Sequence, residues 1–169
     1  MTNPASLVTL TAADHDEILA VLQNDGGYAV RVNGQPAEPH DVTELLTEKP
    51  PQVPTENHHV IGLRVDADLA GVASLVVGWP EPDITFLGLL QLRADHQGKG
   101  LARYFHQALR DTFPGRWRLT VVDTNAQVIP IWERLGYLPT GRRTDWMSPS
   151  GLHHETVEME APAQPSRPV

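Results

Sequence analysis

The pattern of apolar positions predicts a strand, a glycine turn and a helix near the middle of the chain. The run from Ile84 to Leu92 is short and almost wholly apolar, as expected for a buried strand. Apolar residues then recur at helical spacing and form one stripe, which consists of Leu101, Phe105, Ala108, Leu109 and Phe113. Between the two elements lies the turn Gln97-Gly98-Lys99-Gly100-Leu101-Ala102.

The remaining pattern predicts short strands and helices on both sides of this unit. Further strands are predicted at 7–10, 60–65, 71–79, 118–122, 137–146 and 152–159. Helices are predicted after a capping box of Thr11 and Asp14, after a cap at Asp41, and from Pro130 to Gly136. The stretch 28–32 alternates like an extended chain and ends in a turn at 33–34.

This order predicts an α+β fold, with a mixed sheet and helices on both of its faces. A chain of 169 residues is long enough for one domain with a sizeable core. We expect a single domain over 1–160 and a disordered, proline-rich tail over 161–169.

The charge pattern bears on the partners. The formal net charge is −8, the isoelectric point is near 5.4, and no block of more than two consecutive Lys or Arg occurs. A nucleic-acid binder is therefore disfavoured. A cationic small molecule or a protein amine matches this charge better, although an ordinary acidic surface is the simpler explanation of it.

Other residue types exclude further classes of site. The chain contains no cysteine, which removes disulfides, thiolate metal sites and cysteine nucleophiles. The pair His153-His154 lacks the spacing of a metal site, so we expect no metal. No signal peptide and no stretch long enough to cross a membrane is evident, so a cytoplasmic protein is expected.

The glycine turn is the strongest chemical signal. The first amides of a helix have no internal partner and lie at the positive end of its dipole. Gly98 and Gly100 would let a phosphate or another oxyanion approach these amides. The alternative is that the two glycines only shape a tight connection between strand and helix.

Two blocks resemble one enzyme family. The turn QGKGLA, residues 97–102, is similar to the Gln/Arg-x-x-Gly-x-Gly/Ala signature of GNAT-superfamily N-acetyltransferases, and it has the same place between strand and helix. The segment 125–137, NAQVIPIWERLGY, resembles the second block of that family. The resemblance extends to the order of elements from Leu7 to Met159 and is loose between Tyr28 and Asn57.

The resemblance implies a site for acetyl-CoA as cosubstrate. The family fold has a mostly antiparallel sheet with a splayed strand pair, and the pantetheine arm of the cofactor lies between the two strands. The pyrophosphate would bind the amides of the glycine turn, and the oxyanion donor would be an amide near Leu92. The residues implied in cofactor binding are Leu90, Gln91, Leu92, Gln97, Gly98, Lys99, Gly100, Leu101, Ala102, Asn125 and Trp132.

The catalytic groups are less defined, because Trp132 stands where the family commonly has a tyrosine that protonates the leaving thiolate. An indole N–H cannot deliver a proton at accessible pH. The thiolate could leave unassisted or through water, or Tyr137 or Thr124 could replace the missing acid. Candidate bases are Asp83, together with Glu81, His58 and His59.

The leading hypothesis is therefore an N-acetyltransferase that uses acetyl-CoA and a primary amine of a small molecule or peptide. The first alternative is a non-catalytic acyl-CoA-binding or regulatory domain, suggested by Trp132. The second is a dinucleotide-binding oxidoreductase, which is disfavoured because Arg103 stands where a third glycine should be. Tyr28, Trp79 and Trp146 could line the acceptor pocket, and the resemblance allows a homodimer.

Overall fold

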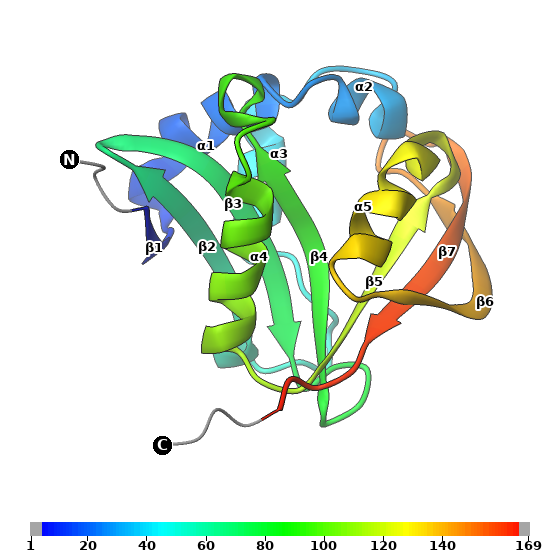
Figure 1. Cartoon of the computed structure of the whole chain (residues 1–169). Helices are drawn as coiled ribbons and strands as arrows, with labels where there is room; N and C mark the ends of the chain where they lie inside the picture. Colours follow the sequence, from blue (N-terminus) through cyan, green and yellow to red (C-terminus); the bar gives the residue numbers. More distant parts are fainter. Residues whose placement is uncertain (1–4, 166–169) are drawn as a thin grey trace.

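A twisted seven-stranded sheet forms the centre of the molecule (Figure 1). The structure is a computed structural model and describes residues 5–165. The strand order is β1-β2-β3-β4-β5-β7-β6, and every neighbouring pair is antiparallel except β4 and β5. The strands are β1 (Ser6–Thr9), β2 (His58–Val65), β3 (Asp68–Val77), β4 (Ile84–Leu92), β5 (Arg116–Val122), β6 (Leu138–Met147) and β7 (His153–Ala161).

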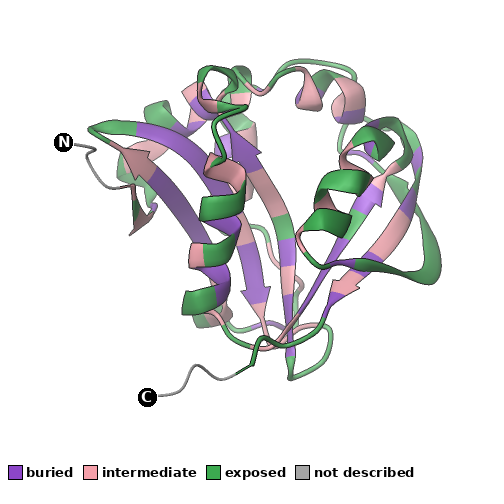
Figure 2. Ribbon diagram, viewed as in Figure 1, coloured by how far each residue is buried: buried purple, intermediate pink, exposed green. Residues whose placement is uncertain are grey.

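Helices cover both faces of the sheet, which confirms the predicted α+β fold. On one face, α4 contributes Phe105 and Leu109 to a core that also contains Trp117. On the other, Ile18 of α1 and Val42 of α3 pack in a second core. Figure 2 shows buried residues along the central strands and exposed residues on the outer side of α4. The helices are α1 (His15–Gln23), α2 (Tyr28–Asn33), α3 (Pro39–Thr47), α4 (Leu101–Thr112) and α5 (Ile129–Arg134), with short 3-10 turns η1 (Ala12–Asp14), η2 (Thr55–Asn57), η3 (Ala94–His96) and η4 (Asp123–Val128).

The parallel pair β4 and β5 separates after a short contact. The two strands are in register only where 84–86 lie opposite 116–118, and both continue beyond that point. Opposite β3, the register passes from Ser74↔Leu89 to Leu75↔Leu87, so that Gly88 is an extra residue in β4. Such a bulge bends a strand locally. The splayed strand pair is therefore present, and it leaves one backbone edge of β4 without a strand partner.

The stretch 28–32, expected as extended chain, is a helix instead. Its buried residues are Ala29 and Val32, three apart as in a helix, whereas Val30 is exposed. The Asp25 carboxylate accepts hydrogen bonds from the amides of Gly27 (2.8 Å) and Ala29 (2.7 Å), which satisfies donors at the start of α2. The apparent alternation therefore came from side chains that lie on different sides of one short helix.

Two smaller boundaries also differ from the prediction. The helix α3 begins at Pro39, and Asp41 is its third residue, where its carboxylate accepts from the amide of Glu38 (2.7 Å). At the other end, Ala161 is the buried last residue of β7, and the carbonyl of Pro162 accepts from Arg110 (2.5 Å). The tail predicted from 161 therefore begins with residues held against the domain, and 166–169 lie outside the described residues.

Candidate active site

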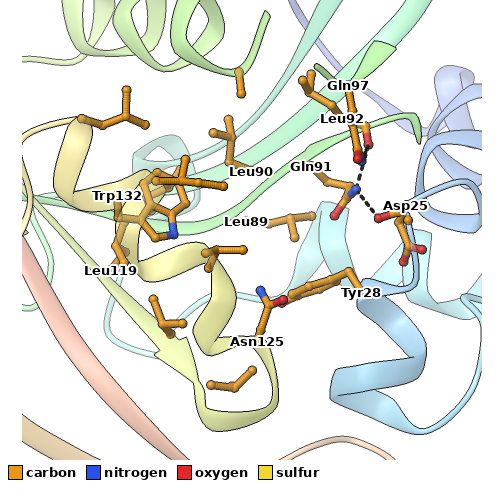
Figure 3. A pocket seen from close by; sticks show the side chains of 18 of the residues that line it. Asp25, Tyr28, Leu89, Leu90, Gln91, Leu92, Gln97, Leu119, Asn125 and Trp132 are labelled. Atoms are coloured by element: carbon orange, nitrogen blue, oxygen red, sulfur yellow. Dashed lines mark hydrogen bonds between the residues drawn. The ribbon is translucent and has the colours of Figure 1, made fainter. Parts of the chain in front are cut away.

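The gap between β4 and β5 contains a cavity of about 420 Å³, which we call the strand cavity (Figure 3). Its walls are the separated halves of the two strands, with α5 on one side and the loop before α2 on the other. Its lining is Asp25, Gly26, Tyr28, Arg31, 87–92, Gln97, Gly98, 100–102, 119–122, Asn125, Val128, Ile131, Trp132 and Leu135. All residues predicted to bind the cofactor line this cavity except Lys99.

The glycine turn forms one end of the strand cavity. Gly98 and Gly100 have φ of +76° and +77°, a left-handed conformation that favours glycine, and a Cβ added at either would meet nothing within 4 Å. Gly100 immediately precedes α4, so the first amides of this 12-residue helix have no partner within the helix. The turn therefore presents free backbone donors beside open space.

Two glutamine side chains form hydrogen bonds at the C-terminal end of the open edge of β4. The carbonyl oxygen of Leu92 accepts hydrogen bonds from Nε2 of Gln91 (2.8 Å) and Nε2 of Gln97 (3.1 Å). Nε2 of Gln91 also donates to the backbone carbonyl of Asp25 (3.1 Å), as the dashed lines in Figure 3 show. The amide of Arg93 donates to the carbonyl of Ala70 in β3. Successive amides of a strand point in opposite directions, so the amide of Leu92 points away from β3, toward the cavity.

The opposite wall contains Asn125, which is buried in η4. Its Oδ1 accepts from Nε2 of Gln127 (3.0 Å) and from Nη2 of Arg31 (3.3 Å), and Arg31 also donates to the carbonyl of Gly26 (3.0 Å). Arg31 therefore links α2 to η4 across the top of the strand cavity. Arg31 was not among the site residues predicted from the sequence, because an extended chain was predicted where α2 lies.

Trp132 of α5 faces the strand cavity and packs on a buried pair behind it. The ring of Trp132 lies 6.0 Å from His106 and 5.5 Å from Tyr137. Nε2 of His106 lies 2.7 Å from the hydroxyl of Tyr137, and burial lowers the pKa of His106 to about 4. Burial also raises the pKa of Tyr137. Tyr137 is fully buried and does not line the cavity, so its hydroxyl reaches His106 rather than a bound ligand.

A second cavity of about 300 Å³, which we call the helix cavity, adjoins the first. It shares five lining residues with the strand cavity: Asp25, Tyr28, Gly88, Leu89 and Gln91. Its other lining residues are Leu22, Ala29, Asn33, Ala37, Asp41, Glu44, Leu45, Glu48, Ser74 and Pro149. The two cavities therefore meet at the bulge of β4, beneath the start of α2.

Tyr28 stands at this junction. Its ring extends from α2 toward Asn125 in Figure 3. Burial, and secondly the charge of Asp25, raise its pKa, so the hydroxyl keeps its proton at neutral pH. Among the described residues, no group hydrogen-bonds to this hydroxyl. A protonated donor thus lies where the two cavities join.

The carboxylate candidates at the start of β4 lie outside both cavities. Nε of Arg116 lies 2.7 Å from the carboxylate of Asp83, and Nη2 lies 3.0 Å from that of Glu81. The hydrogen bond from Arg116 is the first cause that lowers the pKa of Asp83. A carboxylate held in its charged form by arginine is a poor proton acceptor. The structure therefore places Asp83 in an ion-pair cluster and not beside the cavities.

The other polar candidates are dispersed. Nε2 of His58 lies 3.3 Å from Oγ of Ser74, which lines the helix cavity, whereas His59 packs on Phe113 with ring centres 4.8 Å apart. Burial lowers the pKa of both histidines. Thr124 is exposed and lines neither cavity.

The aromatic residues named for the acceptor pocket divide in the same way. Of the three, only Tyr28 lines the strand cavity or the helix cavity. Trp79 packs edge-on against Phe86, with ring centres 5.1 Å apart, and Trp146 stacks on His154, with ring centres 5.7 Å apart.

Two other kinds of site are absent from residues 5–165. No helix in this part of the chain is both long and apolar enough to cross a membrane. No group of three or more His, Cys, Asp or Glu side chains there is arranged to hold a metal ion.

Comparison with solved structures finds the same fold in several proteins. An acetyltransferase from Thermus thermophilus superposes with a TM-score of 0.72 and 18% identity, covering 96% of this chain and 99% of its own. The ribosomal-protein-S18-alanine N-acetyltransferase from Escherichia coli gives 0.68 and 17%, covering 97% of each chain. The PaiA N-acetyltransferase from Thermoplasma acidophilum, in complex with coenzyme A, gives 0.60 and 13%, covering 94% of this chain and 99% of its own.

The sequence comparisons give one match. A search of curated protein sequences finds no significant relative. The model of the acetyltransferase (GNAT) family, however, matches residues 15–137, which include the strand cavity's glycine turn, Asn125 and Trp132. Because this match spans well over half of the sequence, the chain belongs to the GNAT acetyltransferase family.

Proposed function

We propose that this protein transfers the acetyl group of acetyl-CoA to a primary amine of a small molecule or peptide. The observation that carries this proposal is the strand cavity: an unpaired edge of β4 faces it, and the glycine turn before α4 closes one end. Membership of the GNAT family supports the reaction class, and the complex of a structural neighbour with coenzyme A supports the cofactor.

The residues of the strand cavity fit this cofactor. Free amides at 98–102 would bind the pyrophosphate, and the absence of Cβ atoms at Gly98 and Gly100 leaves room for it. The open edge of β4 at Leu90 and Leu92 would hydrogen-bond the pantetheine amides as a neighbouring strand does. When bound, acetyl-CoA supplies an activated acetyl thioester, and the amide of Leu92 would donate a hydrogen bond to its carbonyl oxygen.

The acceptor amine would enter through the helix cavity. Its nitrogen forms a bond to the acetyl carbon, the carbon–sulfur bond breaks, and the products are an acetylated amine and coenzyme A. An ammonium group must first lose a proton, and the departing thiolate must gain one. Gly88, Leu89 and Gln91, which line both cavities, mark where the two reactants would meet.

Tyr28 and His58 are the groups that we assign to these proton transfers. Tyr28 keeps its proton at neutral pH and lies at the junction, so its hydroxyl would protonate the thiolate in place of the tyrosine that Trp132 replaces. His58 would take the proton of the amine through Oγ of Ser74, since burial lowers its pKa and leaves it neutral at pH 7. Asp83 and Tyr137 have no direct route to a ligand in either cavity.

Trp132 also supports a second candidate function, a domain that binds acyl-CoA without turnover. The two functions differ in whether coenzyme A is released only when an amine is present. We expect the enzyme to act in the cytoplasm. A homodimer would use the exposed edge strand β6, on which Leu138 and Met147 are exposed.

The first test is thermal unfolding with acetyl-CoA and, as a control, with NAD. A ligand that binds the folded state raises the apparent stability, so acetyl-CoA should raise the melting temperature and NAD should not. Amines are then screened for thiol release. Release that depends on an amine establishes the enzyme, and binding without release establishes the acyl-CoA-binding domain. If millimolar acetyl-CoA gives no shift, the proposal fails.

A further inference from the structure

The charged groups that line the helix cavity are all acidic. They are four carboxylates, from Asp25, Asp41, Glu44 and Glu48, and no Lys, Arg or His of residues 5–165 lines this cavity. Oδ1 of Asn33, another lining residue, is buried and has no hydrogen-bond donor among the described residues. Apolar side chains form the remaining wall, among them Leu22, Ala29, Ala37, Leu45 and Leu89. The cavity therefore offers acceptors and negative charge around an apolar centre.

Glu44 and Glu48 are the two carboxylates of this lining that do not stabilise the fold through a contact of their own. Asp25 caps α2 and Asp41 belongs to the capping box of α3, but neither glutamate side chain forms an ion pair or a hydrogen bond with another described residue. They lie four residues apart at the C-terminal end of α3, where the helix has no basic residue. Like charges at this spacing repel each other, and the helix dipole also disfavours negative charge there.

An independent observation on β4 points to the same kind of ligand. Gln91 is only 7% exposed, and its Nε2 is used by two backbone carbonyls, those of Asp25 and Leu92. Since carbonyls only accept hydrogen bonds, this network fixes the orientation of the amide group. Its Oε1 is left without a donor among the described residues and points into the space shared by the two cavities (Figure 3). This oxygen is accessible from the cavities, so it can accept a hydrogen bond from an N–H group of a ligand.

We infer that the helix cavity selects an acceptor with two cationic groups on an alkyl chain, an α,ω-diamine or a longer polyamine. One amine lies at the junction, where Oε1 of Gln91 accepts its hydrogen bond and orients it toward the strand cavity. The alkyl chain follows the apolar wall past Leu45. The second ammonium lies between Glu44 and Glu48, where it removes their mutual repulsion.

This inference rests on the proposed function and names the substrate class for it. A monoamine would satisfy Gln91 but leave the two glutamates uncompensated. A chain that ends in a carboxylate would add a third negative charge beside them. A basic peptide would also bring positive charge, but a cavity of about 300 Å³ holds a short alkyl chain more readily than several residues.

The experiment compares acceptors that differ only at the distal end. For each length from three to seven carbons, the diamine, the monoamine and the amino acid with a terminal carboxylate are tested with the full chain. Binding to the protein loaded with coenzyme A is measured by calorimetry, and kcat/KM is measured with acetyl-CoA. At the best length we expect about a tenfold preference for the diamine over the monoamine, from two partly exposed charge contacts.

Two variants locate the preference. The double substitution Glu44→Gln and Glu48→Gln should reduce the diamine preference to about twofold or less in both measurements. Glu56→Gln is the matched control: Glu56 is exposed in η2 and lines neither cavity, so the preference should stay as in the wild type. Circular dichroism and the melting temperature establish that both variants are folded.

The possible failures can be told apart. If acetyl-CoA binds and amines react, but diamines show no preference at any length, the inference is wrong and the proposed function stands. The inference is equally wrong if the preference survives in the double variant, or if a basic peptide is the only acceptor that binds. Without any acetyl-CoA binding, the proposed function itself fails. If acetyl-CoA binds without turnover, the calorimetric preference alone decides.

Discussion

The two cavities meet at the same bulge, yet they are built from different parts of the chain. The strand cavity takes its binding groups from backbone: the open edge of β4 and the amides before α4. The helix cavity takes them from side chains: those on and next to α2 and α3, and that of Gln91 on β4. A backbone site needs few particular side chains, and its glycines are visible in the sequence. A side-chain site can change its ligand with one substitution.

The residues that line both cavities connect the backbone site to the side-chain site. In Gln91 the backbone belongs to the strand cavity and the side chain extends to the helix cavity. Tyr28 of α2 adds a hydroxyl donor that reaches both cavities. Substitutions at these and neighbouring positions should therefore separate cofactor binding from acceptor use.

The largest effect is expected for Gly100→Glu. The new carboxylate would lie beside the pyrophosphate, and repulsion of about 3 kcal/mol should raise the Kd for acetyl-CoA about a hundredfold or more. Gly141→Glu is the control for backbone strain, because its φ of +86° is equally left-handed and its Cβ also meets open space. Calorimetry of both folded variants checks the result. An unchanged Kd in Gly100→Glu would show that the turn does not hold phosphate.

Tyr28→Phe is expected to affect the chemical step. Loss of the proton donor should lower kcat about a hundredfold and change the Kd for acetyl-CoA about twofold or less. Tyr104→Phe is the control, because this hydroxyl donates to the carbonyl of Ala5 on the outside of α4 (2.9 Å). Steady-state kinetics and calorimetry separate the two effects. A kcat near the wild-type value in Tyr28→Phe would assign the proton transfer to water.

A smaller effect should distinguish the two glutamines at the edge of β4. Gln91→Met removes the acceptor at the junction, so KM for the amine should rise about tenfold, the value of one hydrogen bond to a charged group. Gln97→Met is the matched control, since Gln97 also donates to Leu92 but lines only the strand cavity. Equal KM changes in the two variants would mean that both act only by supporting β4.

The smallest effect concerns the attachment of α2. Nε2 of His154 lies 2.7 Å from the carbonyl of Val32, and Nδ1 lies 2.9 Å from the Asp123 carboxylate. Both partners only accept hydrogen bonds, so the two bonds form together only when both ring nitrogens carry protons and the imidazole is charged. The bond to Val32, and secondly the bond to Asp123, raise the pKa of His154. The protonated histidine thus ties α2 to both β7 and η4, whereas the neutral form can donate only one of the two bonds.

Because this pKa is higher in the folded state, the stabilisation is fully present below the pKa of the unfolded chain, about 6.5. It is lost as the pH rises through the folded-state pKa. We expect a contribution of about 1 kcal/mol, seen as a difference between the wild type and His154→Phe in urea unfolding that fades toward high pH. His153→Phe, at the exposed neighbouring position, should keep the wild-type profile. A pH-independent difference would contradict the ionic clamp.

The sequence was informative where backbone geometry dictates residue type. Gly98 and Gly100 predicted the turn before α4, and the apolar stripe predicted the face of α4 that packs in the core. The block containing Asn125 and Trp132 placed two residues that now line the strand cavity. In each case the residue type that the local backbone or helix face needs is also the type that the folded protein needs at that position. The tertiary position could therefore be inferred from the local spacing.

The acceptor side could not be inferred in this way. Tyr28, Val30 and Val32 alternate in sequence as in a strand. The stretch is nevertheless a helix, whose two caps are Gly27 and Gly34 in the left-handed conformation. Glu44 and Glu48 look like ordinary surface residues until α3 is placed beside β4. Only the tertiary fold brings these side chains together. Asp83 is a case in which the sequence suggested a role that the fold removes. Its position before β4 suggested a base, but Arg116 of β5 forms an ion pair with its carboxylate.

The short register between β4 and β5 also has a mechanical consequence. With only 84–86 opposite 116–118, the half of the sheet formed by β5, β7 and β6 is hinged to the other half at one end. Small contacts from α2 to η4 and β7 brace the other end. A cofactor that hydrogen-bonds along β4 would act as a removable eighth strand. Its arrival should stiffen the whole sheet, so amide exchange should slow in β5 and β7 as well as in the cavity.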